Sequence, residues 1–211
     1  MPLPFTPQEM LAIVVGASFA AGLNVYATVA VLGLLSRADL FSLPPSLHLL
    51  QAWPTIAAAI ALFVIEFFAD KIPGFDLIWN ALQTFVRVPV AGLLAYGATA
   101  QLSPGEQIAS AVLASAIAFA AHGGKTAIRA AITPSPEPLS NIGLSLGEDV
   151  LAVGLVWLAT RHPYIAAVIV AILLVLLVII VRMISRSLRT LFHGAKVQWQ
   201  KLQLEWLGSG D

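Results

Sequence analysis

Two things are scarce in this chain of 211 residues: cysteine and charge. It contains no cysteine, which excludes disulfide bonds and thiol-based metal or redox chemistry. Only 10% of its residues are charged, whereas soluble proteins carry about 25%. The 11 basic residues are balanced by 11 acidic ones, so nothing in the net charge indicates a nucleic-acid partner.

Apolar residues take the place of the missing charges. They make up 59% of the chain, and the mean hydropathy is +0.89. A soluble core of this size could not bury so much apolar side chain. The composition therefore predicts an integral membrane protein. No basic residue precedes the first apolar segment, so we expect that segment to be retained rather than cleaved as a signal peptide.

Six apolar segments reach the roughly 17–25 residues that a membrane-spanning helix needs. Two of them open with an N-terminal capping pattern, Thr6-Pro7-Gln8-Glu9 and Ser103-Pro104-Gly105-Glu106. Pro89 is expected to kink or break the third segment. The predicted fold class is all-α, a polytopic membrane helix bundle with six spans. The segments cover about residues 9–35, 54–71, 76–100, 105–131, 140–160 and 164–183.

The chain ends in a basic tail, residues 186–211, after a transmembrane domain that covers residues 1–185. Arginine and lysine alternate with apolar residues there, which predicts an amphipathic helix lying along the membrane face. A helical extension into the cytoplasm is the alternative. Since basic residues favour the cytoplasmic side, we place the tail there. Six spans then put both termini on the cytoplasmic side of a bacterial inner membrane.

The sequence also contains short motifs that recur, which we call internal echoes. Phe19-Ala20-Ala21 recurs as Phe119-Ala120-Ala121, in two helices that run in opposite directions in a six-span topology. An inverted repeat with halves of about 6–100 and 103–185 is the simplest cause. A second echo pairs the segments after Pro73 and Pro134, which run in the same direction. One inverted repeat cannot produce both, so either one echo is a coincidence or residues 76–100 do not cross fully.

Polar side chains occur within the apolar segments and fall on shared helix faces. Lipid solvates such groups badly, so each needs a partner, a cavity or a function. Arg87 is predicted near mid-depth, paired with Glu148, Asp149 or Glu66. The candidate residues for binding a substrate or ion are Asn24, Glu66, Asp70, Asp76, Arg87, His122, Lys125, Arg129, Glu148 and Asp149.

These residues permit two interpretations. The first is a hydrated cavity open to the cytoplasm, in which Lys125 and Arg129 near a glycine-interrupted helix suit an anionic group and the carboxylates suit protons or cations. The second is that the ion pairs only lock the bundle. Gly123-Gly124-Lys125-Thr126 is similar to the end of a phosphate-binding loop, but Phe119 occupies the position of its first glycine and no strand precedes it, so we reject a nucleotide site.

The leading functional hypothesis is a transporter or channel-like protein for a small solute or ion. A lipid flippase or scramblase that handles phosphate-bearing lipids is the alternative, and a non-transporting membrane scaffold is a third. We predict no enzymatic activity, no cofactor and no bound metal; a carboxylate site for a hard cation and an intramembrane enzyme are weaker alternatives. The expected partners are membrane lipids and the solute or ion, with no nucleic acid, and homo-oligomer formation is left open.

Several polar motifs lie within or between the apolar segments. They are Gly22–Tyr26, Ala69–Asp76, Thr84–Pro89, Ala121–Lys125, Ser135–Pro138 with Ser140-Asn141, and Glu148–Val150. At these motifs the chain resembles the bacterial membrane family known as domain of unknown function 4126, and the similarity covers about residues 10–185. The resemblance implies an integral membrane protein and supplies no activity and no site residues.

Overall fold

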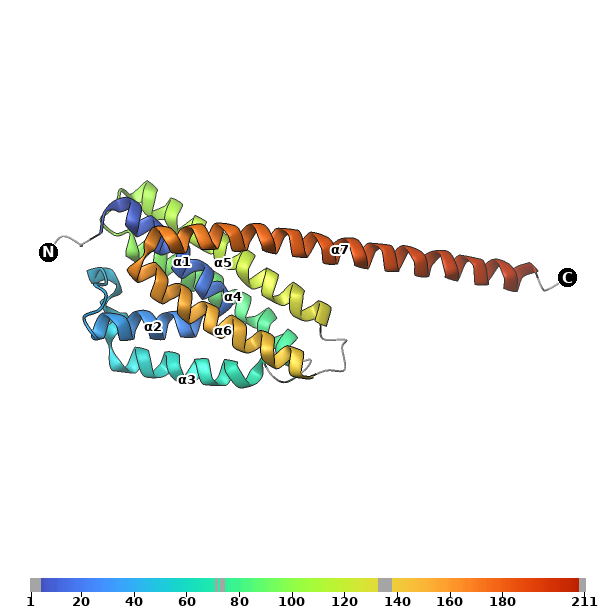
Figure 1. Ribbon diagram of the computed structural model, residues 1–211, viewed down its shortest axis with the longest axis horizontal. Helices are drawn as coiled ribbons and strands as arrows, with labels where there is room; N and C mark the ends of the chain where they lie inside the picture. The colour runs from blue at the N-terminus through green and yellow to red at the C-terminus, as the bar shows by residue number, and fades with distance from the viewer. Residues whose placement is uncertain (1–4, 71, 73–74, 133–137, 209–211) are drawn as a thin grey trace.

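The computed structural model describes residues 5–70, 72, 75–132 and 138–208, without the side chains of residues 76–77, 132, 138–141 and 187–208. Within these ranges the chain is helical and contains no strand, which confirms the all-α fold class (Figure 1). The elements are α1 (Pro7–Leu23), α2 (Val25–Arg37), the short 3₁₀ helix η1 (Pro45–Gln51), α3 (Trp53–Ala69), α4 (Phe75–Ala98), α5 (Pro104–Ile132), α6 (Pro138–Arg161) and α7 (Pro163–Gly208).

Four of the described helices, α4 to α7, are long and apolar enough to cross a membrane. The pair η1 and α3, bent by 63°, gives a fifth candidate if it counts as one span. Helix α4 runs through Pro89 without a break and is 24 residues long, so the structure does not favour a partial crossing there. Six spans are not confirmed, because the first predicted span, residues 9–35, is divided into α1 and α2 at Asn24.

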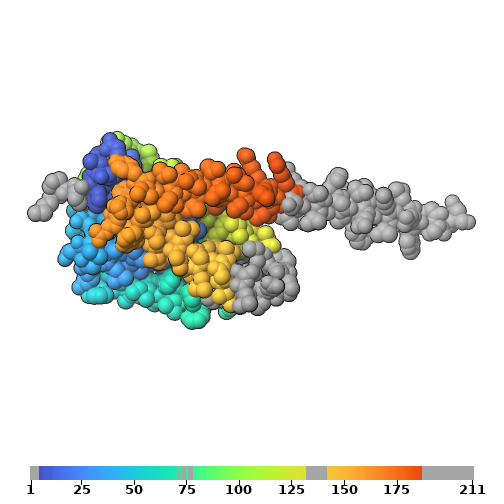
Figure 2. Space-filling view, in the orientation of Figure 1, coloured from blue at the N-terminus to red at the C-terminus, as the bar shows by residue number. Residues whose placement is uncertain are grey.

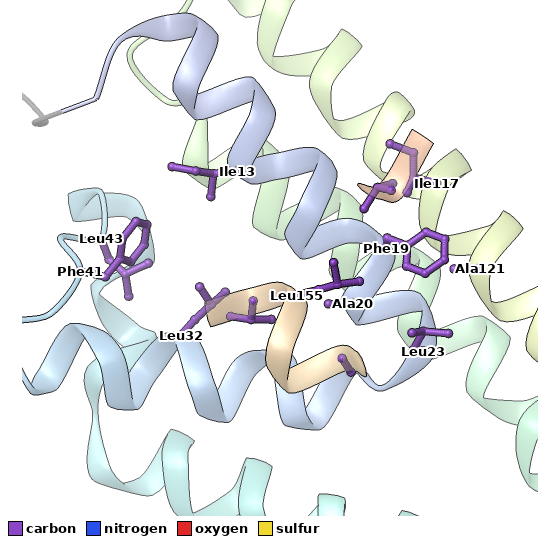
Figure 3. Close-up of a cluster of buried hydrophobic side chains, with 13 residues drawn as sticks. Ile13, Phe19, Ala20, Leu23, Leu32, Phe41, Leu43, Ile117, Ala121 and Leu155 are labelled. Carbon is purple, nitrogen blue, oxygen red and sulfur yellow. The ribbon is translucent and has the colours of Figure 1, made fainter. Parts of the chain in front are cut away.

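Helices α1 and α2 double back on each other. Phe5, which precedes α1, lies against Phe41, which follows α2, with ring centroids 5.4 Å apart. Ile13 of α1 and Leu32 of α2 belong to the same buried cluster, to which Leu155 of α6 also belongs (Figure 3). The outer ends of both helices therefore lie at one end of the bundle, and the break at Asn24 lies inside it (Figure 1).

This hairpin bears on the expected topology. The start of α1 lies at the end of the bundle where α7 begins, and α7 runs to the opposite end (Figure 1). The expectation that both termini are on the cytoplasmic side depended on six crossings, which are not confirmed. If α1 and α2 together make no crossing, the start of α1 and the end of α7 face opposite sides of the membrane.

Helices α1 and α5 run in the same direction, not in opposite directions. Both begin with a capping box at the same end of the bundle: Thr6 with Glu9, and Ser103 with Glu106 (Figure 1). These two caps confirm the predicted helix starts. The parallel course, however, is not the arrangement that an inverted Phe-Ala-Ala repeat requires.

Small residues let these helices approach closely. A Cβ atom added to Gly22 of α1 would lie 2.5 Å from the carbonyl oxygen of Ala118 and 2.8 Å from the Cβ of Ala121. Nearer the start of α1, a Cβ atom added to Gly16 would lie 2.7 Å from the Cβ of Ala159 in α6. Contacts between small residues are the usual basis of helix packing in membranes, where apolar burial gives little driving force.

Helix α7 covers the bundle with an apolar surface. Only 11% of its most apolar stretch is buried, as expected for a helix that faces lipid. Figure 2 shows its described side chains along one edge of the molecule. The helix continues without a break to Gly208 and extends past the other helices (Figure 1). The amphipathic character predicted for the tail concerns side chains beyond Arg186, which lie outside the described residues, so its position on the membrane face stays a prediction.

The hairpin topology can be tested by cysteine labelling, because the chain contains no cysteine of its own. Gln8, His162 and Ser185 are exposed; His162 directly precedes the membrane-crossing part of α7, and Ser185 lies at its far end. We expect a membrane-impermeant maleimide to label Gln8→Cys and His162→Cys from one side of sealed vesicles and Ser185→Cys from the other. Labelling of Gln8→Cys and Ser185→Cys from the same side would instead support six crossings.

The contact between α1 and α5 makes a second prediction. Gly22→Ala should lower the free energy of unfolding by about 1–3 kcal/mol, the usual cost of overpacking, because its Cβ would meet backbone atoms of α5. Gly123→Ala is the matched control, since Gly123 is exposed and its Cβ would meet nothing within 4 Å. Thermal unfolding in detergent should separate the two variants, and equal stability would contradict the close packing.

Candidate functional site

The site begins at the helix break. The extended backbone of Asn24 (φ −153°, ψ 101°) ends α1, and its N–H donates to the carbonyl oxygen of Ala20 at 2.8 Å. Its side-chain oxygen accepts a hydrogen bond from the N–H of Ala27 at 2.9 Å and so caps α2. Asparagine is among the best N-cap residues. One fully buried residue therefore closes one helix and opens the next.

Two cations satisfy the carbonyl groups at the end of α1. Arg87 of α4 donates through Nη1 to the carbonyl oxygens of Gly22, at 3.1 Å, and Leu23, at 2.8 Å. Lys125 of α5 donates to the Leu23 oxygen at 3.3 Å. The last carbonyls of a helix have no partner within it and carry a partial negative charge. Without water, each would cost several kcal/mol, so the two cations make the break tolerable inside the bundle.

Arg87 also forms an ion pair with Glu66 of α3, through Nη2 and Oε1. Glu66 is one of the three partners predicted for it. Another of the three, Glu148, pairs with Lys125 and Arg129 instead. Arg87 and Glu66 are both fully buried.

The remaining ion pairs form a compact square. Lys125 lies 2.8 Å from Asp70 and 3.2 Å from Glu148. Arg129 lies 3.0 Å from Asp70 and 2.6 Å from Glu148. Lys125 also approaches Glu66 at 3.7 Å, which joins this square to the pair at Arg87. Residues from α3, α4, α5 and α6 thus form one ionic network.

The network is almost closed to solvent. The side chains of Glu66, Arg87, Lys125 and Arg129 have no exposed surface, and that of Asp70 is 2% exposed. A hydrated cavity open to the cytoplasm was one of the two predicted arrangements, and ion pairs that only lock the bundle were the other. In the structure these charges face one another, and only the rim of the network, at Glu148 with 9% of its side chain exposed, approaches the surface.

His122 supports Arg87 from the other side. Its Nδ1 lies 3.0 Å from Arg87 Nη1, and its Nε2 lies 2.8 Å from the Asn80 carbonyl oxygen and 2.9 Å from Thr84 Oγ1. A guanidinium group can only donate, so Nδ1 must accept and Nε2 must carry the proton. The contacts therefore require a neutral His122 in this state. Thr84 is a contact that the helix-face pattern did not single out.

Asp149 connects α6 to the helix break. Its Oδ1 accepts a hydrogen bond from Nδ2 of Asn24 at 2.9 Å, and both residues are buried. The side chain of Asp76 lies outside the described residues. Nine of the ten predicted site residues are therefore placed, and hydrogen bonds and ion pairs join them around the end of α1.

The predicted helix interruption at Gly123-Gly124 is absent, because α5 is continuous through both glycines. Gly124 instead packs against Leu177 of α7, where a Cβ atom would overlap the leucine side chain. The helix break near these basic side chains is at Asn24, between α1 and α2. The sequence analysis considered side chains and did not predict that the carbonyl oxygens of Gly22 and Leu23 bind Arg87. Asn24, a preferred N-cap residue within an apolar segment, could have indicated a helix end there.

An all-helical chain with four or five candidate membrane spans and an ionic network in its interior is a polytopic membrane protein. It belongs to the family described as Domain of unknown function (DUF4126), whose model matches residues 11–183. The resemblance noted in the sequence is thereby confirmed. No curated protein and no solved structure gives a significant match to the chain.

The Arg87–Glu66 pair predicts a non-additive response to mutation. Arg87→Met leaves the buried Glu66 carboxylate without its main cation and should cost about 3–5 kcal/mol of unfolding free energy. Adding Glu66→Gln restores the charge balance and should recover part of that loss, though not the part due to the α1 carbonyls. Thermal unfolding in detergent measures the cycle, with Arg161→Met, at an exposed arginine, as the control. Additive losses would contradict direct pairing.

Proposed function

We propose that this protein is a membrane transporter for a small solute or ion, and that the α1–α2 break with the ionic network around it is the transport site. One observation carries the proposal: two helix ends meet inside the bundle at Asn24, next to buried groups of both charge signs. Discontinuous helices whose ends face a charged interior are the usual construction of ion and substrate sites in transporters.

The energetics support this function over a scaffold. A continuous helix through residue 24 would satisfy its own backbone, and apolar packing stabilises a bundle at least as well as buried ion pairs do. The chain instead has both a broken helix and a buried network. Neither feature is needed merely to hold helices together, whereas a transporter needs polar groups that can exchange partners.

The lipid-handling alternative has less support. A surface groove of about 450 Å³ lies between α2, α3 and α4, and its lining includes Val25, Tyr26, Leu62 and Val90. A lipid headgroup would require a cation at the mouth of such a groove. Arg87 is fully buried and is not part of the lining, so a small solute fits the site better than a phosphate-bearing lipid does.

The proposed orientation places the C-terminal end of α7 in the cytoplasm of a bacterium, with the protein in its inner membrane. Arg182 and Arg186 are exposed directly after the apolar part of α7, and such residues favour the cytoplasmic side. The hairpin of α1 and α2 then enters from the opposite face.

Flux measurements in liposomes test the proposed function. Purified protein should carry H⁺, Na⁺, K⁺ or a small anion such as phosphate or lactate across the bilayer. Asn24→Ala and Arg87→Ala should abolish that flux, because the first removes the cap at the break and the second removes the cation that holds its carbonyls. Arg161→Ala, at an exposed arginine, should leave the flux unchanged.

The same liposomes separate the three hypotheses. Scrambling of a fluorescent lipid without solute flux would support the lipid-handling alternative. Neither activity in correctly folded protein would support the scaffold.

A further inference from the structure

The ion pair between Arg87 and Glu66 is only half formed. Glu66 Oε1 accepts from Arg87 Nη2, but Glu66 Oε2 and Arg87 Nε have no hydrogen-bond partner among the described residues, although both atoms are buried. Nε and Nη2 together form the side-on edge of a guanidinium group, which binds both oxygens of a carboxylate or phosphate in a bidentate pair. Glu66 therefore occupies one of the two positions on this edge.

The charged groups around Glu66 belong to several helices. Arg87 of α4 and Lys125 of α5 face it, the neutral His122 lies beyond Arg87, and Asp70 caps the end of the helix that carries Glu66. Glu148 and Asp149 of α6 complete the described set of acids. Isolated buried charge is costly in a medium of low dielectric constant, so a buried acid whose negative charge is poorly compensated is the one that takes up a proton.

The contacts distinguish Glu66 from the other acids as the group that takes up this proton. Asp70 and Glu148 each touch both Lys125 and Arg129 at 3.2 Å or less. Asp149 has a buried oxygen without a hydrogen-bond partner among the described residues, as Glu66 does, but its other oxygen accepts from Asn24 Nδ2 and the residue is 7% exposed. Glu66 touches one cation closely, lies 3.7 Å from Lys125, and has no exposed surface.

We propose that Glu66 is the proton-binding group of the transport site, and that a small oxyanion takes its place on Arg87 when Glu66 is protonated. This inference depends on the proposed transport function and specifies its ligands as a proton with a carboxylate- or phosphate-bearing solute. The proton adds to a carboxylate oxygen of Glu66, and the neutral acid releases Nη2. A singly charged anion then enters, and the net charge of the network is unchanged.

The guanidinium group stays in place during this exchange. Its Nη1 remains held by the carbonyl oxygens of Gly22 and Leu23 and by His122 Nδ1, none of which loses its charge or dipole when Glu66 is protonated. The side-on edge is therefore presented in a fixed orientation. A preorganised edge of this kind binds an oxyanion without the cost of ordering a long side chain.

Infrared difference spectroscopy tests the protonation. During a pH titration, wild-type protein should show the carbonyl stretch of a buried protonated carboxylic acid. Glu66→Gln should abolish that band, Glu66→Asp should restore a shifted one, and Glu106→Gln, at an exposed carboxylate, should leave it unchanged. Persistence of the band in Glu66→Gln, with the fold verified by gel filtration, would overturn the proposal.

Proton uptake on anion binding tests the exchange. Acetate or lactate added to weakly buffered protein near neutral pH should cause uptake of protons from the medium, measured with a pH dye. The uptake should disappear in Glu66→Gln and in Arg87→Met. No uptake with either anion, or equal uptake in Glu66→Gln, would overturn the exchange.

The two proposals fail in different ways. If wild type and Glu66→Gln carry the same flux in liposomes, transport stands and the role of Glu66 is wrong. If Glu66 binds a proton and an anion replaces its carboxylate on Arg87 but no flux occurs, Glu66 is a proton site in a protein that is not a transporter.

Discussion

The contact between Arg87 and the end of α1 is the interaction on which the rest of the structure depends. A helix that ends inside a membrane protein exposes carbonyl groups that lipid cannot solvate. Arg87 donates to two of them and Lys125 to one. Once these cations are inside the bundle they need counter-charges, which Glu66, Asp70 and Glu148 supply. The helix break and the ionic network are therefore one feature and not two.

The network also determines how the helices are tied together. Ion pairs join α3 to α4 and α5, and α5 to α6, while Asn24 joins the α1–α2 hairpin to α6 through Asp149. Elsewhere the contacts of α1 rely on small residues such as Gly16 and Gly22. The contacts of α1 with α5 and α6 thus depend on close packing of small residues, whereas the network depends on directional polar contacts.

Much of the class and of the site could be predicted from the sequence. Length and apolar composition gave the membrane helices, the two capping boxes gave the starts of α1 and α5, and helical spacing brought His122, Lys125 and Arg129 onto one buried face. The course of the chain could not be predicted, because an apolar segment of 27 residues with one asparagine can form either a single span or a hairpin. The choice depends on Arg87 and Lys125, which lie far along the chain. The partner of Arg87 was equally a matter of three-dimensional arrangement, since three carboxylates had suitable spacing.

The position of the hairpin at the start of the chain has a consequence for biogenesis. Ribosomes make α1 and α2 before α4 and α5, so the carbonyls of Gly22 and Leu23 exist before the cations that bind them. During that interval the hairpin has no stable place in the hydrocarbon interior. It must wait at the membrane surface or within the insertion machinery until the later helices arrive. The hairpin is therefore synthesised before α4 and α5 but can take its final position only after them.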